Sequence, residues 1–190
     1  MDPFWLIVLV LLALVIFYGI FLYNNLVRLK HNVSRAWSNI DVLLKQRHDE
    51  LPKLVETCKQ HMAYEQETLE KVMQARSAVA SAREAGNVGA LGQAETQMRI
   101  GLGNLFAVAE AYPELRASES FQHLHQRITS LETGIADRRE YYNDSVNNLN
   151  IRIEQFPDII IAKRLHFLPA TLLEFDEADL KDPDMKKLFS

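Results

Sequence analysis

The chain has 190 residues, enough for one domain and an appendage, and its composition excludes several classes of protein. Hydrophobic residues make up 48% of it, with only 7 glycines and 6 prolines, which indicates a packed protein rather than a disordered one. The net charge of -4 disfavours nucleic acid as a partner, because a phosphate binder needs a basic face. The single cysteine, Cys58, excludes an intramolecular disulfide.

Residues 4–23 form an uncharged apolar run that predicts a transmembrane helix in the lipid bilayer. A helix of this length spans roughly 30 Å, the thickness of the hydrocarbon core. Trp5 lies near one end, and Tyr18 and Tyr23 lie near the other, where aromatic rings act as membrane-interface anchors. A cleaved signal peptide would have a basic start, a shorter core and a small-residue cleavage site, so the run favours an uncleaved anchor.

Basic residues predict the orientation of this anchor. No Lys or Arg precedes the run, whereas Arg28, Lys30 and Arg35 follow it closely. By the positive-inside rule, the N-terminus lies outside and the helical domain lies in the cytoplasm.

Helical periodicity continues directly from the anchor. The apolar residues that follow recur at intervals of three and four and share one face: Leu26, Leu29, Val33, Trp37, Ile40 and Leu44. The pattern predicts a continuous helix to about Leu51, with Pro52 kinking it or starting a new one. The helical pattern then resumes through Met73 and ends at a C-cap and turn over residues 86–89.

Two further helices are predicted over about 90–111 and 118–155. The first has an apolar stripe of Leu91, Ala94, Met98, Leu102, Leu105 and Ala109. The second begins at Ser118 as N-cap and has a heptad seam with one stutter, made of Phe121, Leu124, Ile128, Leu131, Ile135, Tyr142, Val146, Leu149, Ile153 and Phe156. One or two short helices follow Pro157.

The predicted fold class is all-α. A short N-terminus and transmembrane helix occupy residues 1–23, and an elongated antiparallel, coiled-coil-like bundle of three or four helices occupies residues 24–175. A charged C-terminal tail over residues 176–190 is expected to be frayed or reserved for a contact.

Several blocks of this sequence resemble the LemA family. The most specific is residues 23–56, YNNLVRLKHNVSRAWSNIDVLLKQRHDELPKLVE, and residues 112–143 are similar as well. The last part of the sequence also resembles the family, with Phe156-Pro157 followed by Phe167 and by Leu173-Glu174-Phe175. Gln46 and Leu149 depart from the common pattern without affecting the assignment.

The resemblance implies a bacterial protein of the inner (cytoplasmic) membrane whose helical domain is cytoplasmic. It implies no established enzymatic activity, cofactor or active-site residue. Relatives in the family include a magnetosome-associated protein, and LemA genes often lie beside the gene of a membrane metalloprotease. A membrane metalloprotease or another membrane protein is therefore an expected partner.

Few side chains suggest chemistry. His61 and Glu65 are at i and i+4, a spacing that suits two metal ligands on a helix, but a site needs more ligands and no HExxH motif occurs. A surface helix pair is the favoured interpretation. Cys58 lies on an apolar stripe, which favours packing over a nucleophile.

Polar residues embedded in the seams are the more informative candidates. Arg47, His48 and Asp49 close the first helix of the bundle. An interhelical polar network that fixes helix register is a hypothesis for Asp41, Glu132, Arg139, Asn143 and Asn147. The alternative, that these side chains face water, stays open.

The leading functional prediction is a membrane-anchored, non-enzymatic scaffold that self-associates and docks membrane partners, without metal or cofactor. Confinement of the copies to a plane raises their effective concentration and favours a homo-oligomer. The alternative is a membrane-tethered, metal-dependent hydrolase or another enzyme, which would need a pocket with converging ionisable groups. A sensor or adaptor shares every sequence feature with the scaffold.

Overall fold

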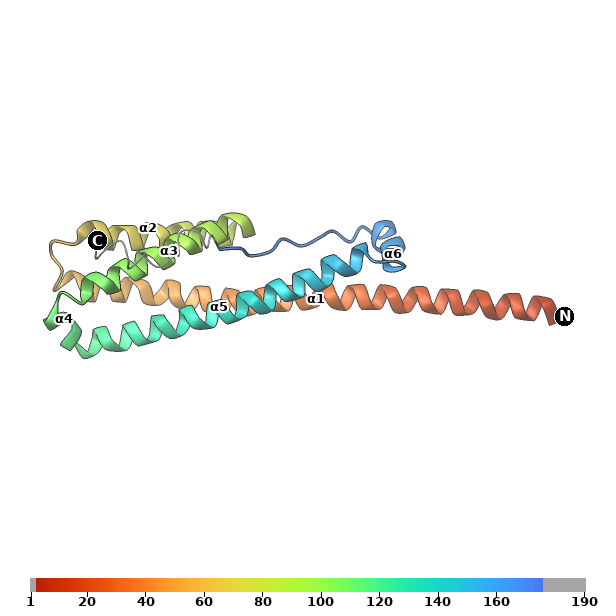
Figure 1. Cartoon of the computed structure of the whole chain (residues 1–190), viewed down its shortest axis with the longest axis horizontal. Coiled ribbons are helices and arrows are strands. Elements are labelled where there is room, and N and C mark those ends of the chain that lie inside the picture. Colours follow the sequence, from red (N-terminus) through yellow and green to blue (C-terminus); the bar gives the residue numbers. More distant parts are fainter. Residues whose placement is uncertain (1–2, 176–190) are drawn as a thin grey trace, which may run out of the picture. The chain divides into compact units, whose positions relative to one another are not determined.

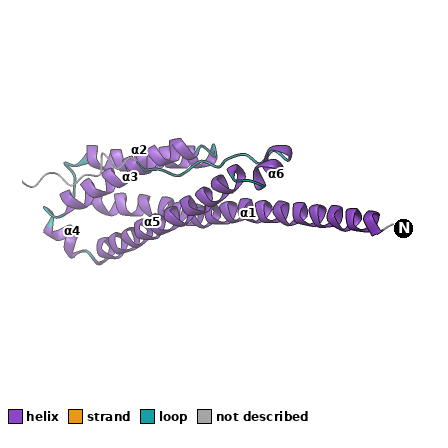
Figure 2. Ribbon diagram, turned by 45° about the vertical axis from the view of Figure 1, so that its right-hand side comes forward, coloured by secondary structure: helices purple, strands orange, loops and turns teal. Residues whose placement is uncertain are grey.

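The computed structural model describes residues 3–175, which form six helices and no strand (Figures 1 and 2). The helices are α1 (Pro3–Lys59), α2 (Gln66–Glu84), α3 (Val88–Ala109), α4 (Pro113–Ala117), α5 (Glu119–Glu154) and α6 (Asp158–Arg164). The predicted all-α fold is confirmed. The predicted tail over residues 176–190 lies outside the described residues.

α1 runs through Pro52, so no new helix starts at this proline. Proline lacks the N–H that would otherwise donate to the carbonyl four residues earlier, which leaves the oxygen of His48 free. Arg76 of α2 takes this acceptor, because its Nε donates to the His48 carbonyl at 2.9 Å. A side chain from the neighbouring helix thus replaces the backbone bond that Pro52 cannot make.

The predicted helical continuity from residue 54 to residue 73 is wrong, because α1 ends at Lys59 and α2 begins at Gln66. Between them, the N–H groups of His61 and Met62 both donate to the Cys58 carbonyl, at 3.0 and 2.8 Å. Met62 is fully buried, so its side chain holds this turn against the core.

The turn between α2 and α3 lies where the sequence predicts it. Gly86 has a φ of +63°, and the N–H of Asn87 donates to the Ala82 carbonyl at 3.0 Å, as in a Schellman motif. The Asn87 side chain caps α3 by accepting from the N–H of Ala90 at 3.0 Å. The predicted apolar stripe of α3 is buried in full.

α5 also follows its sequence pattern. Ser118 lies just before it, and its Oγ accepts from the N–H of Phe121 at 3.5 Å, which confirms the N-cap. The seam is buried at most positions from Phe121 to Ile153. The prediction that Phe156 is the last member of the seam is wrong, because this residue lies beyond the end of α5 and is 81% exposed.

The contacts of the chain divide into two units. Unit 1 contains residues 3–38 and 140–171, and unit 2 contains residues 39–139 and 172–175. The core of unit 1 is a cluster of Leu26, Leu149, Ile153 and Ala162, with Leu29, Val33, Ile161, Phe167 and Ala170 packed against it. The division predicted from sequence, at residues 23 and 175, stays a prediction.

In unit 2, α2 and α3 form a helical hairpin with closely packed small residues. A Cβ built at Gly101 would lie 3.5 Å from Cγ2 of Val72 in α2, whereas one at Gly103 meets nothing within 4 Å. Residues 172–175 pack on α3 as well. A Cβ at Gly92 would lie 2.0 Å from the carbonyl oxygen of Glu174, so only glycine permits this approach.

Candidate functional site

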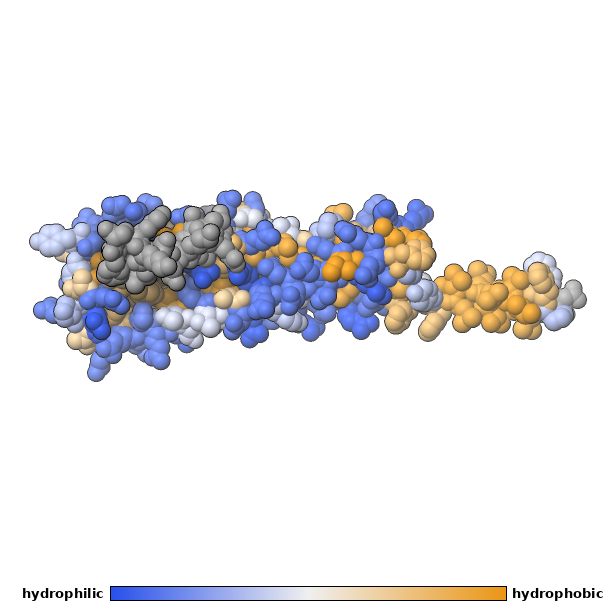
Figure 3. Space-filling model, in the orientation of Figure 1, coloured by the Kyte–Doolittle hydropathy of each residue, from blue (hydrophilic) through white to orange (hydrophobic). Residues whose placement is uncertain are grey.

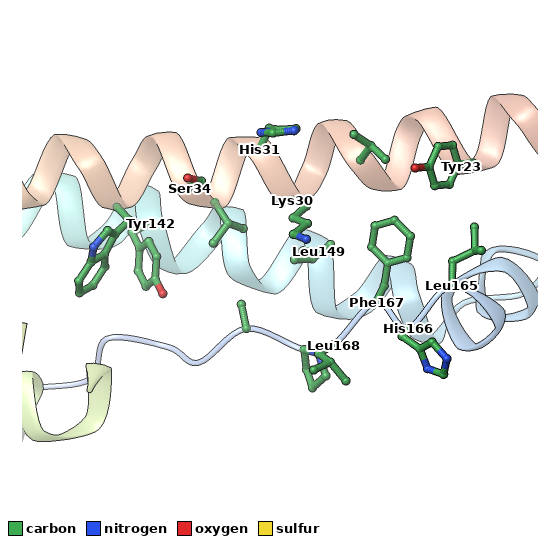
Figure 4. Close-up of a pocket in the computed structure, with 15 residues that line it drawn as sticks. Tyr23, Lys30, His31, Ser34, Tyr142, Leu149, Leu165, His166, Phe167 and Leu168 are labelled. Atoms are coloured by element: carbon green, nitrogen blue, oxygen red, sulfur yellow. The ribbon is translucent and has the colours of Figure 1, made fainter. Parts of the chain in front are cut away.

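A groove of about 1000 Å³ lies in unit 1 between α1, α5 and the segment that follows α6 (Figure 4). We call residues 165–171 the strap. The groove is lined by Tyr23, Val27, Lys30, His31, Val33, Ser34 and Trp37 of α1, Tyr142 and Leu149 of α5, and Leu165, His166, Phe167, Leu168, Pro169 and Ala170 of the strap.

One end of the groove is closed by an aromatic pair. The rings of Trp37 and Tyr142 have centroids 5.5 Å apart and are tilted by 59°. The Tyr142 hydroxyl donates to the carbonyl of Thr171 at 2.9 Å, and burial raises its pKa. The pair thus joins α1, α5 and the end of the strap within unit 1.

The strap is fastened to α5 through its backbone. Asn150 Nδ2 donates to the Ala170 carbonyl at 2.9 Å, and the N–H of Ala170 donates back to Asn150 Oδ1 at the same distance. At the other end, the Phe167 ring meets Tyr23 edge to face, with 6.2 Å between centroids. These contacts give the groove a defined third side without regular secondary structure.

The turn that leads from α6 into the strap has an uncommon backbone. His166 has a φ of +55°, and the N–H of Phe167 donates to the Ala162 carbonyl at 2.9 Å. This is the Schellman pattern, with histidine in the position that glycine usually takes. The left-handed residue directs Phe167 into the core of unit 1.

The lining of the groove determines what it can bind. Its walls are mostly aromatic and aliphatic, and its polar members are Lys30, His31, Ser34 and His166 beside the Tyr142 hydroxyl (Figure 4). Such a lining receives an apolar group and presents cationic or hydrogen-bonding groups at its margin.

Unit 2 contains a buried ion-pair cluster. Arg47 of α1 is 1% exposed and forms a bidentate pair with Glu95 of α3, one bond being Nη1 to Oε2 at 2.9 Å. Its Nη1 also donates to Glu132 Oε1 of α5 at 2.6 Å. Three helices of unit 2 therefore meet through one guanidinium group.

The pKa values of the cluster reflect its burial. Burial alone lowers the pKa of Arg47, but the charges of Glu95 and Glu132 and their hydrogen bonds outweigh it and raise this pKa above its ordinary value. Burial raises the pKa of Glu95, against the opposing charge of Arg47. The charges of Arg47, Glu95 and Glu132 are therefore paired with one another inside the cluster.

The structure distributes the predicted polar-network residues over different contacts. Glu132 joins the Arg47 cluster, and Asp41 pairs with Lys45 at 3.0 Å and with Arg83 of α2 at 3.7 Å. Arg139 lies over the Phe175 ring, 4.2 Å from its centroid. Asn143 is half-buried and Asn147 is exposed. A single network over these residues stays a prediction.

Sequence reasoning missed the buried partner, Glu95. A usable signal existed, because Glu95 lies four residues after Leu91 and three before Met98, on the apolar stripe of α3. Arg47 likewise follows Leu44 by three residues on the buried face of α1. A charged residue on each of two apolar stripes is the pattern of an interhelical ion pair.

The candidate metal pair is not placed on a helix. His61 and Glu65 lie in the turn between α1 and α2, and Glu65 accepts from the Tyr112 hydroxyl at 3.3 Å. Within residues 3–175, no group of three potential ligands is placed to hold a metal ion. Cys58 is fully buried, and burial raises the pKa of its thiol to about 11.

The predicted membrane-interface anchors all lie on α1. Trp5, Tyr18 and Tyr23 are 61%, 52% and 41% exposed. α1 is also long and apolar enough to cross a membrane, with a mean hydropathy of 3.0 in its most apolar window.

Comparison with known proteins places these features in a family. Magnetosome protein MamQ 2 of Paramagnetospirillum magneticum is 28% identical over 158 aligned residues, which cover 71% of this chain and 58% of that protein. MamQ of Magnetospirillum gryphiswaldense is 25% identical with the same coverage, so the chain spans less than two thirds of these relatives. Protein LemA of Metamycoplasma hominis is 26% identical, covering 98% of this chain and 85% of that protein.

A model of the LemA family matches residues 36–186, most of the chain. This match agrees with the blocks over residues 23–56 and 112–143 that resemble the family. The match and the apolar segment of α1 together indicate a membrane-associated protein. The chain belongs to the LemA family.

Proposed function

We propose that this protein is a membrane-anchored, non-enzymatic interaction protein that is held in the bilayer by residues 4–23. One observation carries the proposal: the large apolar side chains from Phe4 to Phe21 are 40% to 72% exposed. No described residue of unit 1 covers most of this surface, and lipid is the solvent that suits it.

The exposure pattern changes where the anchor ends. Leu22 is 4% exposed and Leu26 is fully buried, while their neighbours Tyr23 and Asn24 remain exposed. The same helix is thus apolar on all sides before residue 22 and amphipathic afterwards. A helix that is apolar all round belongs in a bilayer, and an amphipathic one packs on one face only.

An interaction role fits the rest of the chain better than catalysis. The groove of unit 1 is apolar, and the ionisable cluster of unit 2 is internally paired. The MamQ relatives are named as magnetosome proteins, a name that denotes a structure rather than a reaction. We therefore propose a scaffold in membrane organisation or protein quality control, with a membrane metalloprotease or another membrane protein as its partner.

Self-association is part of the proposal. Apolar side chains remain exposed beyond the anchor, among them Tyr141 and Ile151. Membrane confinement raises the effective concentration of such surfaces. Light scattering of the full chain in mild detergent measures its mass, and we expect a dimer or larger assembly. A strict monomer over the working concentration range would refute self-association without affecting the proposed membrane anchor.

Extraction of membranes with alkaline carbonate tests the anchor. Leu9→Arg with Leu12→Arg places two charges near the centre of the span, at a cost of about 2.5 to 3.5 kcal/mol each. We expect the unaltered chain to stay in the pellet and this variant to move to the supernatant. Val42→Arg, at a site 52% exposed on α1, is the matched control and stays in the pellet. An unaltered chain that carbonate releases contradicts the proposal.

A further inference from the structure

We propose that the segment around α6, residues 156–168, is a second membrane contact that lies in the headgroup and outer hydrocarbon region beside the end of the span. The partner is the lipid bilayer itself, with anionic headgroups at its surface. This inference rests on the proposed anchoring of residues 4–23, and it adds a function for α6 that neither the family nor the groove assigns.

The depth of α6 follows from its contacts within unit 1. A Cβ built at Gly19 of α1 would lie 3.9 Å from Cδ1 of Ile161 in α6. Gly19 precedes the last apolar residue of the span, Tyr23, by four residues, or about 6 Å along a helix. Tyr23 itself meets Phe167 just after α6. If residues 4–23 cross the hydrocarbon core, α6 therefore lies beside its final turn.

The surface of this segment is strongly apolar, as expected for a segment in contact with lipid. Phe156 is 81% exposed, Ile160 61%, Leu165 52% and Leu168 78%. Figure 3 shows apolar side chains along the first part of α1 and again over the region of α6. Large apolar side chains gathered so densely in a short segment mark an interaction site rather than ordinary protein surface.

Charge on the same segment complements a bilayer surface. Lys163 and Arg164 form the exposed last turn of α6, and Arg28 and Lys30 follow the span on α1. The acidic group of α6, Asp158, is 1% exposed and accepts from Arg152 Nε at 3.0 Å, so it is withdrawn from the surface. Basic residues at this depth attract anionic headgroups, at about 1 kcal/mol for each side chain near the surface.

Position favours lipid over a protein partner as the occupant. A water-soluble protein cannot reach side chains at the level of Gly19 without entering the bilayer, whereas lipid is already there. A second copy of the chain could cover the patch only within the membrane, and this becomes an outcome of the test.

Site-specific quenching in vesicles tests the proposal with the full chain. Ile160→Cys and Leu168→Cys are labelled singly with a polarity-sensitive fluorophore and reconstituted in vesicles containing phosphatidylglycerol. Leu14→Cys marks the centre of the span, and Val42→Cys is an exposed position on α1 that lies 19 residues beyond Tyr23. The unaltered chain is the labelling blank, because Cys58 is buried.

We expect a lipid with a nitroxide near its headgroup to quench positions 160 and 168 several-fold more strongly than position 42. Aqueous iodide should quench position 42 several-fold more strongly than either. Three results overturn the inference: iodide quenching of 160 and 168 equal to that of 42, protection of both from iodide and nitroxide by protein, or no quenching of position 14 by a second lipid whose nitroxide lies deep in the acyl chain. Only the last of these also removes the proposed anchor, so the two failures are distinguishable.

Discussion

At the level of one residue, Arg47 is a buried charge that links three helices. Its guanidinium donates hydrogen bonds to Glu95 of α3 and Glu132 of α5, so we expect it to fix the register of these helices and α1. The net contribution of the cluster to stability is smaller than the cost of breaking it, because desolvation of the charges offsets their attraction.

Arg47→Met is expected to lower the free energy of unfolding by about 3 to 5 kcal/mol, because it leaves the Glu95 carboxylate buried without a partner. Arg47→Met with Glu95→Leu should recover a large part of this loss. Denaturant unfolding of the full chain in mild detergent measures both. Lys71→Met, which breaks the exposed pair with Glu67, is the control and should leave the free energy of unfolding nearly unchanged. Equal losses for Arg47→Met and Lys71→Met would contradict the assignment.

At the level of an element, α1 depends on α2 to pass Pro52. Arg76 donates to the carbonyl of His48 that Pro52 leaves free, and its Nη2 lies 2.6 Å from His48 Nε2. Burial lowers the pKa of His48, and the charge of Arg76 lowers it further, which keeps the ring neutral as an acceptor. The proline and the arginine should therefore be energetically coupled.

A double-mutant cycle on Pro52→Ala and Arg76→Met measures this coupling. With proline present, loss of Arg76 leaves the His48 carbonyl oxygen without a hydrogen bond, which is expected to lower the free energy of unfolding by about 1 to 3 kcal/mol. With alanine present, the helix supplies its own N–H and the cost of Arg76→Met falls. We expect a coupling energy of about 0.5 to 2 kcal/mol in denaturant unfolding. Strict additivity would mean that the His48 carbonyl is not held by Arg76.

α3 carries two glycines with opposite roles. At Gly92 an added Cβ would collide with the Glu174 carbonyl, whereas at Gly103 it meets nothing. Gly92→Ala is expected to cost about 1 to 3 kcal/mol through displacement of residues 172–175. Gly103→Ala, the matched control, should gain about 0.5 to 1 kcal/mol from helix propensity. Thermal unfolding compares them, and a gain at both positions would show that residues 172–175 do not bind α3.

The elements that the sequence predicted are those with local signals. The stripe of α3, the turn at Gly86 and the cap at Ser118 each arise from spacing or from one residue's intrinsic preference. The end of α1 at Lys59 lacks such a signal, because neither Gly nor Pro marks it and the burial of Met62 holds the turn. Tertiary packing decides that boundary.

The candidate sites were less predictable for the same reason. Arg47 and Glu95 are 48 residues apart, so their pairing depends on how α1 and α3 pack. The strap ends α6 with His166 in the left-handed region, where a glycine would have marked the turn in advance. The groove of unit 1 exists only because this turn brings Phe167 back to Tyr23.

At the scale of the whole molecule, the chain combines one apolar segment with helical units that satisfy their own polar groups. Among the described residues, the buried side-chain polar atoms are satisfied except for Oδ2 of Asp158. Unit 2 pairs the buried charges of Arg47 and Glu95 with each other, and unit 1 offers apolar surface and basic residues next to the proposed span. An apolar surface with basic residues beside the span suits a protein whose binding surfaces lie close to the membrane.

The side of the membrane on which unit 2 lies is the last prediction. Basic residues follow the apolar run closely, so Tyr64 should be cytoplasmic and Asp2, which precedes the run, external. Tyr64 lies in the turn after α1 and is 95% exposed. An impermeant maleimide should label Asp2→Cys in intact cells, and Tyr64→Cys only after permeabilisation. The unaltered chain stays unlabelled, because Cys58 is buried with a thiol pKa of about 11. The reverse labelling pattern would place unit 2 outside and refute the proposed topology.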